Sequence, residues 1–160
     1  ATTKYWVRVS NGIHFCTDTV TVTVKPLPKL SGTKTVTANC SGNVTYNAAS
    51  TVSPTTYIWK RSKVTGITPD SSNGTSGSIN ENLINSTANP ITTTYYFTLT
   101  ANGCSQLDTV TASIIPTPSL SSTKNPNPIC SGDTFKYKAT TATTGATFSW
   151  IRMSLSLIHI

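Results

Sequence analysis

Residues 18–42 read DTVTVTVKPLPKLSGTKTVTANCSG, and residues 108–132 read DTVTASIIPTPSLSSTKNPNPICSG. The opening Asp-Thr-Val and the closing Cys-Ser-Gly both recur 90 residues later, from Asp18 to Asp108 and from Cys40 to Cys130. Two landmarks that agree in spacing without a gap are typical of tandem copies of one structural unit. This stretch therefore determines the architecture that the rest of the sequence has to fit.

The repetition extends outward from this stretch in both directions. KYWVRVSNG at 4–12 corresponds to YYFTLTANG at 95–103, and TYIWKR at 56–61 corresponds to TFSWIR at 147–152, both at an offset of 91 residues. The one-residue differences fall in loops, where insertions cost little free energy. We therefore expect three parts along the chain. These are the C-terminal part of a preceding repeat (1–28), one complete repeat (29–118) and the truncated N-terminal part of the next repeat (119–154).

The last residues, LSLIHI at 155–160, have no counterpart after Trp59. They lack Thr and resemble the translation of a transposase-type sequencing adapter, so we interpret them as a non-native tail; the alternative is a real hydrophobic strand. Six residues are too few for a transmembrane helix, which needs about 20. The chain starts without Met or a signal-peptide pattern, which leaves the question of secretion open.

The composition predicts an all-β protein. Thr and Ser make up about a third of the chain, whereas charged residues make up 11% and strong helix formers are scarce. Residues 19–24 alternate Thr and Val, so Val20, Val22 and Val24 should face the core while the threonines face water. Similar patterns predict strands near 3–10, 34–38, 44–48, 56–61, 78–83, 93–100 and 108–115. About seven short strands per 90-residue unit predict an immunoglobulin-like β-sandwich.

Equivalent aromatic residues mark the predicted core of each repeat. Trp59 and Trp150 occupy the same position, with Tyr57 and Phe148 two residues earlier. A Trp on an early central strand usually fills the core of a sandwich, so we assign all four residues to the core. The alternative is a platform on which a sugar stacks. Trp6 and its equivalent Phe97 each lie beside a Tyr, and alternation turns only one residue of each pair inward. We expect the outward residue of each pair to pack at the surface, with glycan binding as the alternative.

Each repeat contributes one cysteine before its second strand, Cys40 or Cys130, and one in its last hairpin, Cys16 or Cys104. The spacing does not suit a metal site, so the cysteines indicate disulfides in an oxidising compartment. Cys40 and Cys104 are the only pair from one complete copy, and we favour them as partners; those of Cys16 and Cys130 are then expected outside the sequence. An immunoglobulin-like topology places these two positions at opposite ends of the sandwich, so bridging between neighbouring copies is the alternative.

The sequence lacks the residues of a catalytic site. His14 is the only histidine before the tail, and the five carboxylates, at positions 18, 70, 81, 108 and 133, are scattered singly. Neither a nucleophile with its base, nor paired carboxylates, nor a calcium cage can be assembled from them. We expect no enzymatic activity, no cofactor and no metal.

The net charge of +7 raises the question of nucleic acid, but the only basic cluster is Lys60, Arg61 and Lys63. No stacking aromatics or recognition motif accompany it, so we expect a solvated strand end and no nucleic-acid partner. The excess charge would still favour weak, salt-sensitive attraction to anionic polysaccharide or lipid surfaces, without insertion into a membrane.

The succession YYFTLTANGCSQLDTVTASIIPTPSL (95–120), NPICSGDTFKY (127–137) and FSW (148–150) resembles the PKD-like or immunoglobulin-like repeats of large secreted Bacteroidetes surface proteins. The resemblance covers nearly all of residues 1–152. It implies stacked copies in a stalk or adhesive fibre, at the cell surface, exported by the type IX secretion system. PKD domains carry a WDFGDG-type motif, whereas Lys60 and Arg61 follow Trp59 here, so the resemblance is to PKD-like repeats.

The same resemblance gives the Asp-Thr-Val motifs a second meaning. Residues 18–20 and 108–110 resemble the Asp-Thr-aliphatic acceptor of Bacteroidetes O-glycosylation, with Thr19 and Thr109 as the sites of attachment. The alternative is a threonine that merely faces solvent in a strand.

We therefore expect a structural or adhesive repeat segment of a large exported protein. Its partners would be neighbouring repeats of the same chain and, for adhesion, a surface polysaccharide or a host or matrix glycoprotein. Two alternatives stay open: a glycan-binding module, and a passive spacer in a secreted multidomain enzyme.

Overall fold

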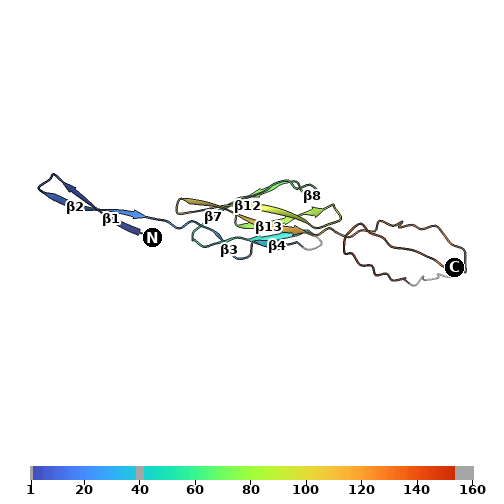
Figure 1. Ribbon diagram of the computed structural model, residues 1–160. Coiled ribbons are helices and arrows are strands. Elements are labelled where there is room, and N and C mark those ends of the chain that lie inside the picture. Colours follow the sequence, from blue (N-terminus) through green and yellow to red (C-terminus); the bar gives the residue numbers. More distant parts are fainter. Residues whose placement is uncertain (1, 39–41, 154–160) are drawn as a thin grey trace.

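A computed structural model describes residues 2–38 and 42–153 of the chain and contains only β-strands within them (Figure 1). An N-terminal hairpin of β1 (Thr2–Ser10) and β2 (Phe15–Thr23) comes first. A β-sandwich follows, and residues 115–153 then continue without a strand. The hairpin and the C-terminal segment lie beyond opposite ends of the sandwich, so the described chain is elongated (Figure 1).

The larger layer of the sandwich is a five-stranded sheet in the order β4-β13-β12-β7-β9. Its strands are β4 (Thr35–Thr37), β7 (Thr56–Arg61), β9 (Ser72–Gly74), β12 (Ile91–Ala101) and β13 (Cys104–Ile114). All neighbours are antiparallel except β4 and β13, which are parallel. The two longest strands form a hairpin around Asn102 and Gly103, both at positive φ, which a two-residue Asn-Gly turn requires.

Shorter strands supply the rest of the fold. The second layer contains the pairs β3 (Leu30–Ser31) with β6 (Ala49–Ser50) and β5 (Asn43–Asn47) with β10 (Ser78–Asn82). A further pair joins β8 (Ile67–Thr68) to β11 (Ile84–Asn85). The pairs β3–β6 and β5–β10 thus lie in one layer, while the hairpin of β12 and β13 lies in the other. This arrangement confirms the predicted immunoglobulin-like all-β fold.

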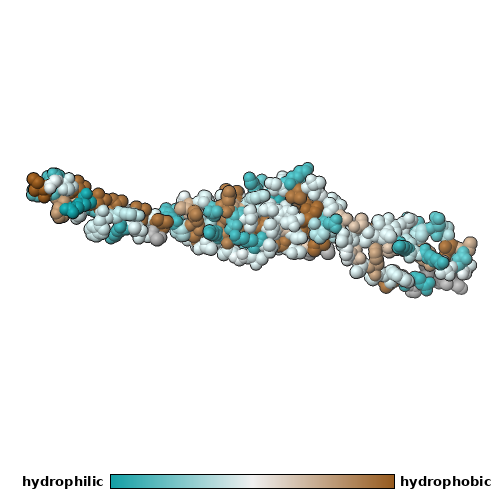
Figure 2. Space-filling model, viewed as in Figure 1, coloured by the Kyte–Doolittle hydropathy of each residue, from teal (hydrophilic) through white to brown (hydrophobic). Residues whose placement is uncertain are grey.

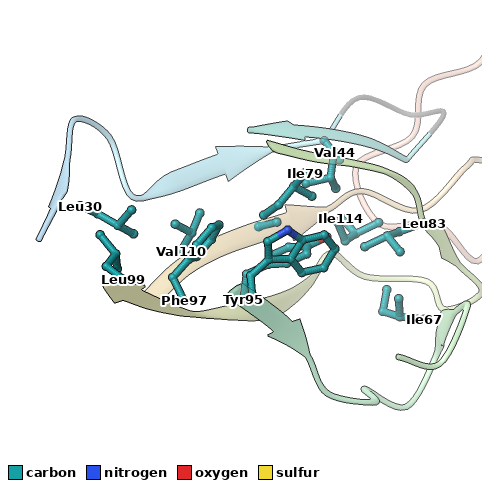
Figure 3. Close-up of a cluster of buried hydrophobic side chains, with 13 residues drawn as sticks. Leu30, Val44, Ile67, Ile79, Leu83, Tyr95, Phe97, Leu99, Val110 and Ile114 are labelled. Carbon is teal, nitrogen blue, oxygen red and sulfur yellow. The ribbon is translucent and has the colours of Figure 1, made fainter. Parts of the chain in front are cut away.

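The core lies between the two layers, where alternate residues of β12 and β13 point inward (Figure 3). Tyr95, Phe97 and Leu99 are fully buried, and Val110 and Ile114 cover them from the neighbouring strand. Side chains therefore alternate along this hairpin with the period of two that extended strands impose.

Trp59 is 6% exposed and belongs to this core, as predicted, with Tyr57 packed against it. Its ring meets the ring of Tyr95 edge-on at 5.6 Å between centroids and covers Gly74 of the neighbouring strand. A Cβ atom at position 74 would lie 2.6 Å from the indole, so only glycine fits beneath the ring. The sugar-platform alternative for Trp59 is thereby removed, since a buried ring offers no face to a ligand.

The other predicted core residues are exposed in this structure, which corrects that part of the assignment. The exposed fraction of Trp150 is 87%, and Phe148, Val20, Val22 and Val24 are between 43% and 59% exposed. Apolar side chains gather visibly along the N-terminal hairpin (Figure 2). The physical reason is that, within the described residues, no second layer of strands covers the N-terminal hairpin or the segment with Phe148 and Trp150. The equivalent residues of the sandwich face such a layer.

The two equivalent hairpins also differ in register by one residue. Val20 pairs with Tyr5 in the N-terminal hairpin, whereas its equivalent Val110 pairs with Tyr95 rather than with Tyr96, the equivalent of Tyr5. A one-residue shift moves side chains to the opposite face of a strand pair. Burial selects the register only where a core exists, and the N-terminal hairpin is exposed along its whole length.

Candidate functional site

The predicted basic cluster at the end of β7 is divided by the fold. Arg61 is 1% exposed and points inward, where its Nε donates to Glu81 Oε2 at 2.9 Å. Its two Nη atoms donate to the carbonyl oxygens of Asp70 and Pro69 at 3.3 and 3.1 Å. Lys63 pairs with the Asp70 carboxylate at the surface. Among the described residues Lys60 is therefore the one member of the cluster without an ion pair.

Glu81 sits at the centre of this buried network. Burial raises the pKa of its carboxyl group, but hydrogen bonds from Arg61, Tyr95 and Ser72 outweigh burial, so the pKa lies below its usual value. Burial, together with the hydrogen bond to Glu81, raises the pKa of the Tyr95 hydroxyl. Both groups thus keep their charge states at neutral pH, which suits a structural network and does not suit proton transfer.

Asp108, the first residue of the repeated Asp-Thr-Val, holds the start of the repeat against its last strand. Both carboxylate oxygens accept from Lys34 Nζ at 2.7 Å, and Oδ2 also accepts from the backbone amide of Leu30. Burial by itself would raise the pKa of Asp108. These hydrogen bonds, with one from the Thr109 amide, outweigh burial, so the pKa lies below its usual value.

Sequence reasoning did not identify this pair, although a signal was present. Lys34 recurs as Lys124, 90 residues on, just as Asp108 repeats Asp18. A lysine and an aspartate that recur together in each repeat are candidates for an ion pair within the repeat. The Asp of the motif has a structural role here, and the glycosylation hypothesis concerns only the threonine that follows it.

The two threonines of that hypothesis are exposed on their strands. Thr109 faces away from the core on β13, and Thr19 lies on the exposed N-terminal hairpin. Accessibility is necessary for modification, but it does not distinguish an acceptor from an ordinary surface threonine, so O-glycosylation stays a prediction.

The cysteines do not come together in the described part of the chain, where Cys16, Cys104 and Cys130 are free thiols. Cys40, the partner that the sequence favoured for Cys104, lies outside the described residues. The Ala38 amide donates to the Ser113 carbonyl oxygen at 2.9 Å, near the C-terminal end of β13, while Cys104 begins that strand. The described residue nearest to Cys40 on its N-terminal side is therefore far from Cys104.

A groove on the outer face of the five-stranded sheet is the best candidate for a functional site. Strand pairing aligns Asn73, Lys60, Tyr96 and Thr109 in one row across four strands. A second row contains Ile58, Thr98 and Leu107. The groove encloses about 820 Å³ above these rows, with Ser62 at its margin.

The depth of this groove follows from side-chain size. Thr98 is short and half-buried, whereas Ile58 and Leu107 on either side are 59% and 71% exposed and stand above it. Tyr96 is 44% exposed and lies in the adjacent row. It lies between Tyr95 and Phe97 on β12. Of the neighbours Tyr96 and Phe97, Phe97 points into the core and Tyr96 faces solvent.

No group of three or more His, Cys, Asp or Glu among the described residues has the geometry of a metal site. His14 lies in the exposed turn of the N-terminal hairpin, where its amide donates to Asn11 Oδ1. No helix within the described ranges is long and apolar enough to cross a membrane.

No family model matches the chain, and no curated protein matches it.

Proposed function

We propose that this chain is a structural and adhesive segment of a stack of β-sandwich repeats on a large exported protein. The observation that supports this proposal is that the N-terminal hairpin and the C-terminal segment leave the sandwich at opposite ends (Figure 1). The chain enters beside the start of β13, where Lys25 contacts Asn102, and leaves at the end of this strand. Units connected in this way stack head to tail into a rod.

Contacts at both ends support the stacking. At the N-terminal joint, Pro28 is buried and Lys25 Nζ donates to the Asn102 carbonyl oxygen in the hairpin turn at 2.8 Å. At the other end, Thr144 of the next segment donates from its amide to the Ala88 carbonyl oxygen at 3.0 Å and from its hydroxyl to Asn89 at 2.6 Å. Prolines in both joints stiffen the connection.

The location and partners follow from the same proposal. An exported fibre would lie at the cell surface, where neighbouring repeats are its first partners and a surface polysaccharide or a host or matrix glycoprotein is its adhesion target. The resemblance to PKD-like repeats implies export by the type IX secretion system. The outer-face groove favours adhesion over a passive spacer, since a spacer needs no concave surface.

Small-angle scattering tests the rod. Three head-to-tail copies of residues 29–118 should have a maximum dimension of roughly 100 to 120 Å, about three sandwich lengths. A compact particle of the same mass would contradict the proposal. A hydrolase assay on the full chain is the parallel test of the expected lack of catalysis.

A further inference from the structure

The groove is a suitable size for a ligand and is not required by the fold. Its volume of about 820 Å³ falls within the range of small-molecule sites. The equivalent segment of the next repeat differs at two outward positions, where Ser149 and Ile151 replace Ile58 and Lys60, while the outward Thr56 recurs as Thr147. Of the inward residues, Trp59 and Arg61 recur and Tyr57 becomes the aromatic Phe148. The core positions thus keep their chemical character, while the two groove positions do not.

The lining includes the buried Trp59 and the exposed ring of Tyr96, together with hydroxyl and amide groups. Tyr96 offers an exposed ring that the core does not use, because Tyr95 and Phe97 fill the inward positions. Thr98, Thr109, Ser62 and Asn73 surround it with side chains that donate and accept hydrogen bonds. An aromatic face for the C–H side of a pyranose and polar groups for its hydroxyls are what a sugar requires.

The charge of the groove specifies the kind of sugar. Lys60 is the only cation in the lining, and within the described residues it has no ion pair. The one carboxylate at the margin, Asp108, is occupied by Lys34 Nζ and two backbone amides. A carboxylate on the ligand would therefore find the unpaired ammonium group of Lys60, the cross-strand neighbour of Tyr96.

A peptide ligand could not add as a strand at the centre of this groove. There β12 pairs with β7 on one side and with β13 on the other, so its backbone offers no free edge. We propose that the outer-face groove of the complete repeat binds an acidic oligosaccharide, with Tyr96 stacking on one sugar ring and Lys60 pairing with a carboxylate. This inference rests on the proposed adhesive function and names the ligand of its binding surface.

Isothermal titration of the full chain with tetragalacturonate, and with a neutral galactose tetramer, tests the inference. We expect binding of the acidic sugar and at least about tenfold weaker binding of the neutral one. Tyr96→Ala and Lys60→Gln should each raise the dissociation constant about tenfold, whereas Tyr96→Phe, which keeps the ring, should bind nearly as well as the parent.

Matched controls lie outside the groove on the same sandwich. Lys63→Gln removes an identical charge from a residue paired with Asp70, and Ile84→Ala removes an exposed apolar side chain from β11. Both should leave the dissociation constant unchanged. Melting curves followed by circular dichroism verify that every variant is folded. We expect the substitutions at Tyr96 and Lys60 to leave the fold intact, because both side chains face solvent.

Four results would overturn the inference. These are no binding of tetragalacturonate by the parent chain, equal binding of the neutral sugar, an equal effect of Lys63→Gln and Lys60→Gln, and equal binding of tetraglutamate, which would indicate a peptide site. None of them bears on the elongated stack, which the scattering experiment tests separately. A compact particle that still binds the acidic sugar would leave the groove intact and remove only the rod.

Discussion

The guanidinium of Arg61 and the carboxylate of Glu81 form a bidentate ion pair inside the sandwich, with Nε–Oε2 at 2.9 Å and Nη2–Oε1 at 3.3 Å. The Arg61 side chain is fully shielded from solvent and that of Glu81 is 9% exposed. The pair connects the five-stranded sheet, through β7, to β10 of the opposite layer. It therefore links the two layers by charge where the rest of the core links them by apolar contact.

Breaking this pair should be costly. Arg61→Met leaves the Glu81 carboxylate buried without its partner, and we expect a loss of about 3 to 5 kcal/mol in the free energy of unfolding. The double variant Arg61→Met/Glu81→Gln should recover much of that loss, because the stranded charge is gone. Lys60→Met, one residue away but facing solvent, is the control and should change stability by less than about 0.5 kcal/mol. Urea titration measures all three, and a single-variant loss no greater than that of the control would contradict the assignment.

Stability should fall in acid. Hydrogen bonds hold the pKa values of Glu81 and Asp108 below their ordinary values of 4.5 and 3.8, so the folded state favours both ionised forms. Their contribution is fully present above those ordinary values and is lost as the pH falls below them toward the lowered folded-state pKa values. Urea titrations from neutral pH down to about pH 3 should follow this loss. Glu81→Gln should flatten the profile, and an unchanged profile would show that Glu81 does not contribute.

Trp59 should not tolerate a smaller side chain, and Gly74 should not tolerate a larger one. Trp59→Ala removes a buried ring and should cost about 3 to 5 kcal/mol of unfolding free energy. Gly74→Ala adds a methyl group 2.6 Å from that ring and should cost about 1 to 3 kcal/mol by overpacking. In the Trp59→Ala background the second change should be nearly neutral, because the clash has been removed. Additive losses in the double variant would mean that the ring does not lie over the glycine.

The arrangement of cysteines leads to a redox prediction. Ser113, which contacts Ala38, lies nine residues along β13 from Cys104, or about 30 Å. A disulfide requires Cα atoms within about 7 Å. We therefore expect both thiols to stay free in a single copy of residues 29–118 incubated with oxidised glutathione.

Two head-to-tail copies should behave differently under the same conditions. Mapping of peptides without reductant should recover a link between Cys40 of the first copy and Cys104 of the second, since stacking brings those two ends together. Cys104→Ser in the second copy should abolish the link, while the same change in the first copy should not. A link within the single copy would restore the pairing that the sequence first favoured.

The sequence by itself determined the fold class and the alternation of side chains along the strands. Alternation in residues 93–101 and 108–114 requires only that side chains of one strand point to opposite sides, which is a local property of extended backbone. The same locality explains why Trp59 was correctly placed in the core. It also explains the short strands that were missed, since two or three residues do not display a period.

Only the tertiary structure decided what lies across the strands. Lys60, Arg61 and Lys63 look alike in the sequence, but pairing with β12 turns Lys60 outward beside Tyr96, while Arg61 reaches Glu81 in the opposite layer. The groove and the contact of Lys34 with Asp108 likewise join segments distant in the chain. Burial of an apolar face also depends on a partner layer, which is why Trp150 is exposed and Trp59 is not. Such relationships depend on strand order and register, which are set by packing among segments far apart and not by the pattern within any one of them.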